Sequence, residues 1–256
     1  IDTVVENNIV NGLEADGGSN ISISGTFAAR NNGVFGVLLI NKVSITRVGA
    51  TATFASNIGG IQVSLNSSMF VNALPPGPPS KIIAEDNSAF GLTVVSSSHL
   101  FLFGAAEVLT RNNGTNGISI FTQSAVELDN GPIIKAEDNA LNGIVLEDST
   151  LNMFNMPQFP GSKLTLRRNG EAGVSVGKAS VFDIGGDASM ISRRNSVGLA
   201  VDDGSTARVR NSKIVRNDQD VVLSFAARAE FEGNNIGGLS CDDTVLIRGD
   251  EHCPDH

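Results

Sequence analysis

The segments NGTNGISI (residues 113–120) and NALNGIVL (residues 139–146) share one pattern: an asparagine, three further residues, a glycine, and then two apolar residues separated by one other residue. Clear copies begin at Asn8, Asn32, Asn87, Asn113, Asn139 and Asn169, and looser copies at Gly60, Asn195 and Asn234. A degenerate copy begins at Asn217 and carries Asp220 where the glycine would stand. Most adjacent copies lie 22 to 31 residues apart, which is typical of a solenoid in which each repeat is one structural unit.

Each repeat holds three short segments in which apolar residues alternate with other residues. In the middle of the chain they are Ile118-Ser119-Ile120, Val126-Glu127-Leu128 and Ile134-Lys135-Ala136. Such alternation is typical of strands, and the segments are too short for helices. Three strands and three turns predict one coil of a parallel β-helix. About ten coils, stacked about 4.8 Å apart, would form a rod about 50 Å long.

From about residue 8 to about residue 240, this pattern resembles the right-handed parallel β-helix repeat proteins, the pectate-lyase-like superfold. The asparagines are its most specific part, because asparagine tolerates a left-handed backbone at a turn and stacked amides can hydrogen-bond from coil to coil. The resemblance and the right-handed crossover rule imply right-handed coils. We therefore predict one all-β domain, a right-handed parallel β-helix, over residues 1–256.

The ends of the chain lie outside the clear repeats. The chain starts at Ile1, which we interpret as a truncated or processed N-terminus. Its two cysteines, Cys241 and Cys253, predict a disulfide that closes a C-terminal tail or cap over residues 241–256. The alternative is a metal pair, but two thiols without convergent histidines are a poor zinc set. A disulfide favours an oxidising compartment, so we expect a secreted or cell-surface protein.

The composition excludes some classes of binding partner. The net charge is 18 − 27 = −9, which argues against a nucleic-acid partner or an anionic membrane surface. No apolar run reaches about 18 residues, so we predict no membrane span.

The second strand of each coil directs one row of side chains outward, and this row is the candidate site. It comprises Ser44, Phe70, Phe101, Glu127, Asn152, Asp183, Arg208 and Glu230. Proline-containing insertions at 72–80 and 155–162 follow this strand in two coils and are expected to wall a groove for an extended chain. We interpret Phe70, Phe101 and Asn152 as candidate ligand-binding residues, since exposed rings stack on sugars or anchor partners. The alternative is that the first insertion covers the two rings.

Glu127, Asp183 and Arg208 are the candidate catalytic residues if the protein is an enzyme. Two carboxyl groups about 9–10 Å apart lie at the upper edge of the separation used in inverting glycoside hydrolysis. The resemblance implies a polysaccharide hydrolase, lyase or epimerase. The sequence lacks, however, the Asn-Thr-Asp and Asp-His-Gly sets of polygalacturonases and the Asp-Pro-His of uronate epimerases. We predict no metal or other cofactor; calcium remains open without a clear site.

Two further rows follow from the repeat. The outward row of the first strand is short-chained and almost uncharged: Leu38, Gln62, Thr93, Ser119, Val145, Ser175, Ala200 and Val222. It is a candidate face for a homo-oligomer or another chain. A charged stripe lies two residues before the asparagines: Arg30, Glu85, Arg111, Glu137, Arg167 and Arg193. Its alternating signs predict pairing between coils, and a cluster of arginines at 167, 168, 193, 194 and 216 is a candidate anion-binding strip.

Two functions stay open. We favour a secreted or surface-displayed scaffold that binds a glycan or protein partner through its side, without catalysis. The alternative is a polysaccharide-active enzyme that acts on an extended polysaccharide at the second-strand face. A fold of this kind does not decide between them, because one superfold hosts many activities.

Overall fold

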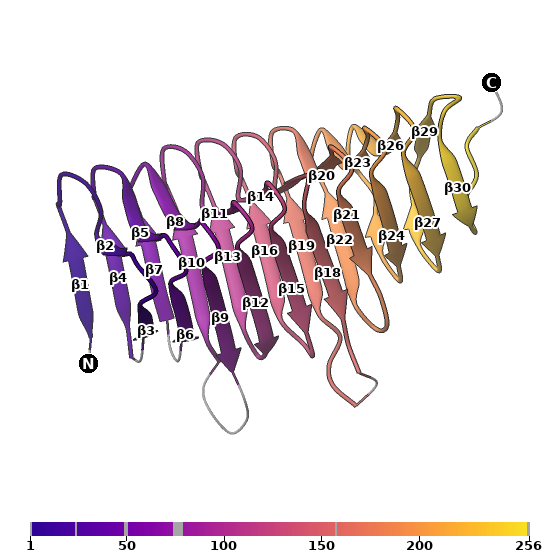
Figure 1. Ribbon diagram of the computed structural model, residues 1–256. Coiled ribbons are helices and arrows are strands. Elements are labelled where there is room, and N and C mark those ends of the chain that lie inside the picture. The colour runs from indigo at the N-terminus through magenta and orange to yellow at the C-terminus, as the bar shows by residue number, and fades with distance from the viewer. Residues whose placement is uncertain (1, 24, 49–50, 74–78, 157, 255–256) are drawn as a thin grey trace.

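The computed structural model describes residues 2–23, 25–48, 51–73, 79–156 and 158–254, and this part of the chain contains strands and turns but no helix. The strands form three parallel sheets of ten strands each (Figure 1). Every third strand belongs to the same sheet, so each circuit of the chain adds one strand to each sheet. The predicted all-β parallel β-helix with three short strands per coil is confirmed.

We name the sheets by the order in which the chain enters them. Sheet A contains β1 (Thr3–Glu6), β4 (Phe27–Arg30), β7 (Thr51–Ala55), β10 (Lys81–Glu85), β13 (Glu107–Arg111), β16 (Ile133–Glu137), β19 (Lys163–Arg167), β22 (Ser189–Arg193), β25 (Lys213–Ile214) and β28 (Asn235–Ile236). Sheet B contains β2 (Leu13–Ala15), β5 (Phe35–Leu39), β8 (Gly59–Val63), β11 (Leu92–Val95), β14 (Ile118–Phe121), β17 (Ile144–Glu147), β20 (Ala172–Gly177), β23 (Val197–Val201), β26 (Gln219–Leu223) and β29 (Leu239–Cys241). Sheet C contains β3 (Asn20–Ile23), β6 (Ser44–Val48), β9 (Ser68–Ala73), β12 (His99–Gly104), β15 (Ala125–Asp129), β18 (Thr150–Phe154), β21 (Val181–Ile184), β24 (Thr206–Arg210), β27 (Arg228–Glu232) and β30 (Leu246–Gly249).

The hydrophobic core fills the inside of the coil. Ile118, Val126 and Ile134, one from each sheet, are fully buried. Ile118 stacks in register between Leu92 and Ile144 of the neighbouring coils. A single coil exposes both edges of its apolar side chains, so the core exists only through this stacking.

An asparagine ladder runs along the corner between sheets A and B. Its members are Asn8, Asn32, Asn57, Asn87, Asn113, Asn139, Asn169, Asn195 and Asn217. Each side-chain Nδ2 donates to the Oδ1 of the next member at 2.8–3.2 Å. The same Oδ1 also accepts the backbone N–H of the preceding member, as Asn139 does from Asn113 at 3.2 Å. The ladder therefore ties each coil to the next through both side chain and backbone.

Two details of the ladder correct the sequence pattern. Asn57 belongs to it although the sequence pattern begins this copy only at Gly60; two residues separate Asn57 from that glycine, as two separate Asn195 from Gly198. Asn234 does not belong to it: this residue precedes β28 at another corner, where its Oδ1 accepts the Ser212 N–H at 2.9 Å. Asp220 instead ends the ladder, since its Oδ1 accepts both the Nδ2 and the N–H of Asn217 at 2.9 and 3.0 Å.

A second ladder, which the sequence analysis missed, follows the corner before sheet C. Its serines are Ser67, Ser98, Ser124, Ser149, Ser180 and Ser205. Each hydroxyl oxygen accepts a backbone N–H from the preceding coil at 3.1–3.2 Å, and all six residues are buried. The signal in the sequence is a serine immediately before each of these second strands. The two ladders thus hold neighbouring coils in register along the axis at two corners.

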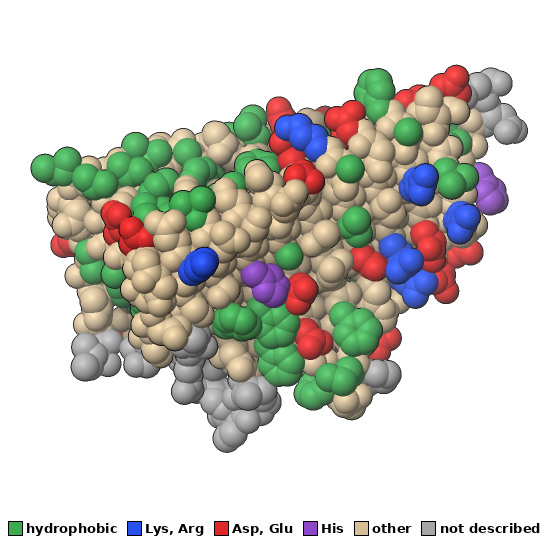
Figure 2. All heavy atoms as spheres, viewed as in Figure 1, with side chains coloured by type: hydrophobic (Ala, Val, Ile, Leu, Met, Phe, Trp, Pro, Cys, Tyr) green, Lys and Arg blue, Asp and Glu red, His purple; other side chains and the backbone are tan. Residues whose placement is uncertain are grey.

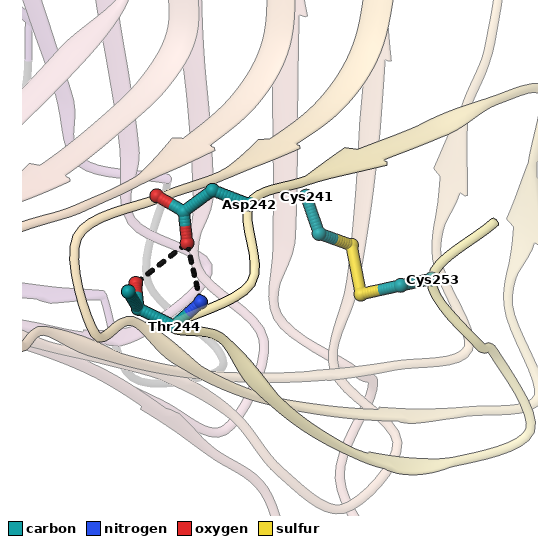
Figure 3. The surroundings of a disulfide bond; sticks show 4 residues. All are labelled: Cys241, Asp242, Thr244 and Cys253. Carbon is teal, nitrogen blue, oxygen red and sulfur yellow. Dashed lines mark hydrogen bonds between the residues drawn. A yellow bond between two sulfur atoms is a disulfide. The ribbon is translucent and has the colours of Figure 1, made fainter. Parts of the chain in front are cut away.

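The predicted disulfide joins Cys241, at the end of β29, to Cys253, with their Cα atoms 5.8 Å apart (Figure 3). The turn that follows Cys241 is closed by Asp242, whose Oδ1 accepts the Thr244 N–H at 2.9 Å and its hydroxyl at 2.5 Å. These bonds, with a further one from the Phe225 N–H, lower the pKa of Asp242. The tail is therefore fastened to the last strand of sheet B.

We expect the double substitution Cys241→Ser and Cys253→Ser to destabilise the C-terminal coil by about 2–3 kcal/mol, because the bridge closes a short loop. Hydrogen exchange should then accelerate in β29 and β30 and stay unchanged in β14, since each coil contacts only its neighbours. Equal acceleration along the whole chain would contradict this local role.

Candidate functional site

The predicted second-strand row lies on the outer face of sheet C. Strand register places its members side by side in the order Phe70, Phe101, Glu127, Asn152, Asp183, Arg208, Glu230 and Arg248. Ser44 is the exception, because it pairs with Ser68 and so lies two residues before the row. The candidate ligand-binding and catalytic residues thus share one surface. In the view of Figure 2, apolar side chains gather beside a histidine, and charged side chains gather toward the C-terminal end of the molecule.

The N-terminal part of the row is aromatic. The ring centroids of Phe70 and Phe101 are 5.8 Å apart, and those of Phe101 and Phe103 are 6.1 Å apart with nearly parallel planes. The His99 ring lies 6.3 Å from Phe101. Phe70 is 37% exposed and Phe101 is half-buried, so the described residues leave part of both rings open. Residues 74–78 of the insertion proposed to cover them lie outside the described residues.

The middle of the row carries carboxyl and amide groups. Nε2 of His99 lies 3.5 Å from Oε2 of Glu127. Asn152 follows in register and is half-buried. No hydrogen bond among the described residues involves the side-chain amide of Asn152. Its Nδ2 donor and its Oδ1 acceptor therefore have no partner in that part of the protein.

Asp129 is a site residue that the sequence analysis did not single out. It stands two residues beyond Glu127 on the same face and pairs in register with Phe103 on one side and Phe154 on the other. Its Oδ1 is buried without a hydrogen-bond partner. Burial, with a smaller contribution from Glu127, raises the pKa of Asp129. The available signal is the alternation in Glu127-Leu128-Asp129, which puts two carboxyls on one face.

The C-terminal part of the row is a chain of ion pairs. Arg208 lies 3.0 Å from Asp183 and 3.3 Å from Glu230. Arg210 extends the chain to Glu230 and Glu232. Asp183, and then Glu230, raise the pKa of Arg208. Asp183 is therefore engaged in an ion pair with Arg208, which does not suit the proton transfer required of a general acid.

The face is hollowed at two places. A shallow groove of about 230 Å³ lies over the ion-paired part, between Val181, Asp183, Arg208 and Leu246. A hollow of about 360 Å³ lies at the corner between sheets C and A, walled by Pro79 and Pro160 and lined by Phe103, Glu107 and Phe159. Both insertions follow strands of sheet C, β9 and β18, as predicted. The hollow between them lies at the edge of the row rather than along it.

Glu107 gives the second hollow a fixed negative charge. Burial would raise the pKa of this carboxyl, but the ammonium groups of Lys135 and Lys81 outweigh burial and lower it. Lys135 Nζ donates to Glu107 Oε1 at 2.9 Å.

Within the described residues no three His, Cys, Asp or Glu side chains are placed to hold a metal ion together. No described helix is long and apolar enough to cross a membrane.

The first-strand row occupies the outer face of sheet B in continuous register from Leu38 to Val222. Its middle is less open than its position predicts: Thr93, Ser119 and Val145 are 6%, 2% and 8% exposed. Asn116 donates to the Ser119 hydroxyl at 3.3 Å. Association of two chains through this face stays a prediction.

The charged stripe lies on the outer face of sheet A. It forms two pairs between coils that the stripe predicts, Arg111 with Glu85 at 2.6 Å and Arg167 near Glu137 at 3.9 Å. Arg30 pairs with Glu6, outside the predicted stripe, at 3.0 Å. The alternation then stops, because Arg193 pairs in register with Arg167. The stripe thus carries two arginines side by side, in β19 and β22.

No family model and no curated protein matches this chain. Among solved structures, it is similar to one described as the crystal structure of the Agl-KA catalytic domain, with 11% identity and a TM-score of 0.38. The match covers 93% of this chain and 61% of that one, so this chain spans less than two thirds of its neighbour. The fold therefore rests on the three sheets themselves.

Proposed function

We propose that the protein is a secreted or surface-displayed β-helix scaffold that binds an extended glycan on the outer face of sheet C without cleaving it. The observation that carries the proposal is the row in which the paired rings of Phe70 and Phe101 adjoin Glu127 and Asn152 in register. Aromatic rings beside hydrogen-bonding groups suit a sugar, whose ring has an apolar face and a polar rim.

The regular spacing of the row supports an extended ligand. Neighbouring positions are one strand apart, about 4.8 Å, so equivalent groups recur along a straight line. A polymer that lies along this line meets rings first, then Glu127 and the side-chain amide of Asn152, which has no partner among the described residues. The disulfide between Cys241 and Cys253 supports an oxidising location.

The ion pairs argue for binding rather than catalysis. Asp183 is engaged by Arg208, and a second carboxyl, Glu127, stands two positions away along the row. This leaves the predicted pair without a free acid. The enzyme alternative retains one supporting feature: the half-buried Asp129, beside Glu127, has one buried carboxyl oxygen and a raised pKa, which is the character of a general acid.

We expect Phe101→Ala to weaken glycan binding about tenfold, the loss of about one stacking contact. Affinity electrophoresis against a panel of neutral and acidic polysaccharides would identify the ligand and measure the change. Asn152→Ala should weaken the same ligand without affecting folding, because this amide has no described protein partner. Phe225→Ala removes a ring that is 68% exposed outside the row and should leave binding unchanged.

Two outcomes would overturn this proposal. The first is wild-type affinity in both Phe101→Ala and Asn152→Ala. The second is the appearance of shortened products by mass spectrometry after incubation with the bound polysaccharide. If Asp129→Asn abolished those products, the protein would be an enzyme with Asp129 as its acid.

A further inference from the structure

We propose that the outer face of sheet A, near its C-terminal end, holds a second binding site, which takes a sulfate or phosphate group. The site is formed by Arg167, Arg193, Arg194, Lys213 and Arg216. It lies on a different sheet from the glycan-binding row and does not depend on that assignment.

The first observation is that four of the five positive charges here have no acidic partner among the described residues. The stripe pairs Arg30, Arg111 and Arg167 with glutamates of neighbouring coils. Within the described part of the chain, no ion pair involves Arg193, Arg194, Lys213 or Arg216. Nε of Arg167 is itself buried without a hydrogen bond. A chain with a net charge of −9 thus collects unpaired cations on one small area.

The second observation is a hollow between these side chains. It measures about 220 Å³ and is lined by Arg167, Arg193, Lys213 and Arg216, with Ile191 and Val215. A water molecule occupies about 30 Å³ in the liquid, so a tetrahedral oxyanion and its ester oxygen have room. The positive charge of Arg167, followed by desolvation and by Arg194 and Arg216, lowers the pKa of Arg193. An anion would relieve this repulsion.

The third observation is a strained backbone under two of the arginines. The residue before each ladder asparagine has a positive φ, near 53–63°, in every coil from Asn7 to Arg216. Early coils place Asn, Ser or Asp at this position, namely Asn7, Asn31, Ser56, Asp86, Asn112 and Asp138. The last three coils place Arg168, Arg194 and Arg216 there. Left-handed backbone suits Asn and Asp far better than a long side chain.

The arginines therefore stand where local backbone preference disfavours them. Arg168 is explained by its two bonds to Asp138, at 2.5 and 2.6 Å. Arg194 and Arg216 have no such partner in the described part of the chain, and backbone strain of this kind clusters at ligand sites. A guanidinium presents parallel N–H donors that match two oxygens of a sulfate or phosphate, and three guanidinium groups, those of Arg167, Arg193 and Arg216, line the same hollow.

The test is calorimetric titration with two probes: inorganic tripolyphosphate and dextran sulfate, with uncharged dextran as the control. We expect both charged probes to bind and uncharged dextran not to bind, with affinity falling as salt rises. The double variant Arg194→Asn and Arg216→Asn should lose about tenfold or more in affinity. Its melting temperature should equal or exceed that of the wild type, because asparagine suits this backbone.

Arg111→Gln is the matched control, since Arg111 belongs to the same stripe but is paired with Glu85. Its affinity for both probes should stay that of the wild type. An equal loss in this control, or no binding of either probe to the wild type, would overturn the proposal. If dextran sulfate binds more tightly per charge, the natural ligand of the site is a sulfated glycan. If tripolyphosphate binds more tightly per charge, the natural ligand is a phosphate compound.

Discussion

Replacement of Asn113 by alanine is expected to lower the free energy of unfolding by about 3–5 kcal/mol, since each buried polar group left without a partner costs about 1–3 kcal/mol. Asn113 is 1% exposed. Its Nδ2 donates to Asn139 Oδ1 at 2.9 Å and to the Ala84 carbonyl at 3.1 Å. Its Oδ1 accepts the Nδ2 and N–H of Asn87 at 3.0 and 3.3 Å. Alanine removes all four bonds at once in the middle of the rod, where water cannot replace them.

Urea denaturation followed by far-ultraviolet circular dichroism measures this loss, because a chain without tryptophan or tyrosine offers little fluorescence. Asn8→Ala is the control, since Asn8 is the exposed first member of the ladder. Only the Oδ1 of Asn32 loses a side-chain donor there, since the backbone N–H of residue 8 still donates to it, and solvent reaches the site. We expect a loss below about 1 kcal/mol for this variant. Equal losses at Asn8 and Asn113 would show that the ladder is not the source of stability.

The fold could be predicted because each coil repeats the same short code. A period of two residues assigns each strand position to the inside or the outside, and the ladder asparagine sets the register between coils. Once both are known, the outward row from Phe70 to Glu230 follows without any knowledge of side-chain contacts. The sequence pattern failed where one residue was missing, at Asn57, and where a neighbouring corner supplied an asparagine, at Asn234.

The chemistry of the row could not be predicted in the same way. Register places Asp183, Arg208 and Glu230 in a line, but it does not say that Arg208 bonds both acids. That outcome depends on side-chain conformations and on competition among nearby charges. Asp129 likewise lies in register between Phe103 and Phe154 of the adjacent coils, so its surroundings are a property of three coils rather than of one segment.

Gly117→Ala is expected to destabilise the protein by about 3 kcal/mol, at the upper end of the usual cost of overpacking. A Cβ atom at this position would lie 2.5 Å from Thr110 Oγ1, 2.7 Å from the Gly143 carbonyl oxygen and 2.8 Å from Asn139 Nδ2. The carbonyl belongs to the backbone of the next coil, and the amide belongs to the ladder. Neither can move without breaking bonds that join the coils.

The glycine column therefore sets how closely the coils approach at the corner between sheets A and B. Gly238 tests this idea, because it stands at the corresponding place in the last coil and a Cβ atom there would meet no heavy atom within 4 Å. Replacing a glycine where space and backbone allow alanine stabilises a protein by about 0.4–1 kcal/mol, through the unfolded state. We thus expect opposite signs for Gly117→Ala and Gly238→Ala in the same urea experiment. If both variants were neutral, the coils would tolerate a wider spacing, and a fixed spacing of the sheet C row could no longer support recognition of an extended ligand.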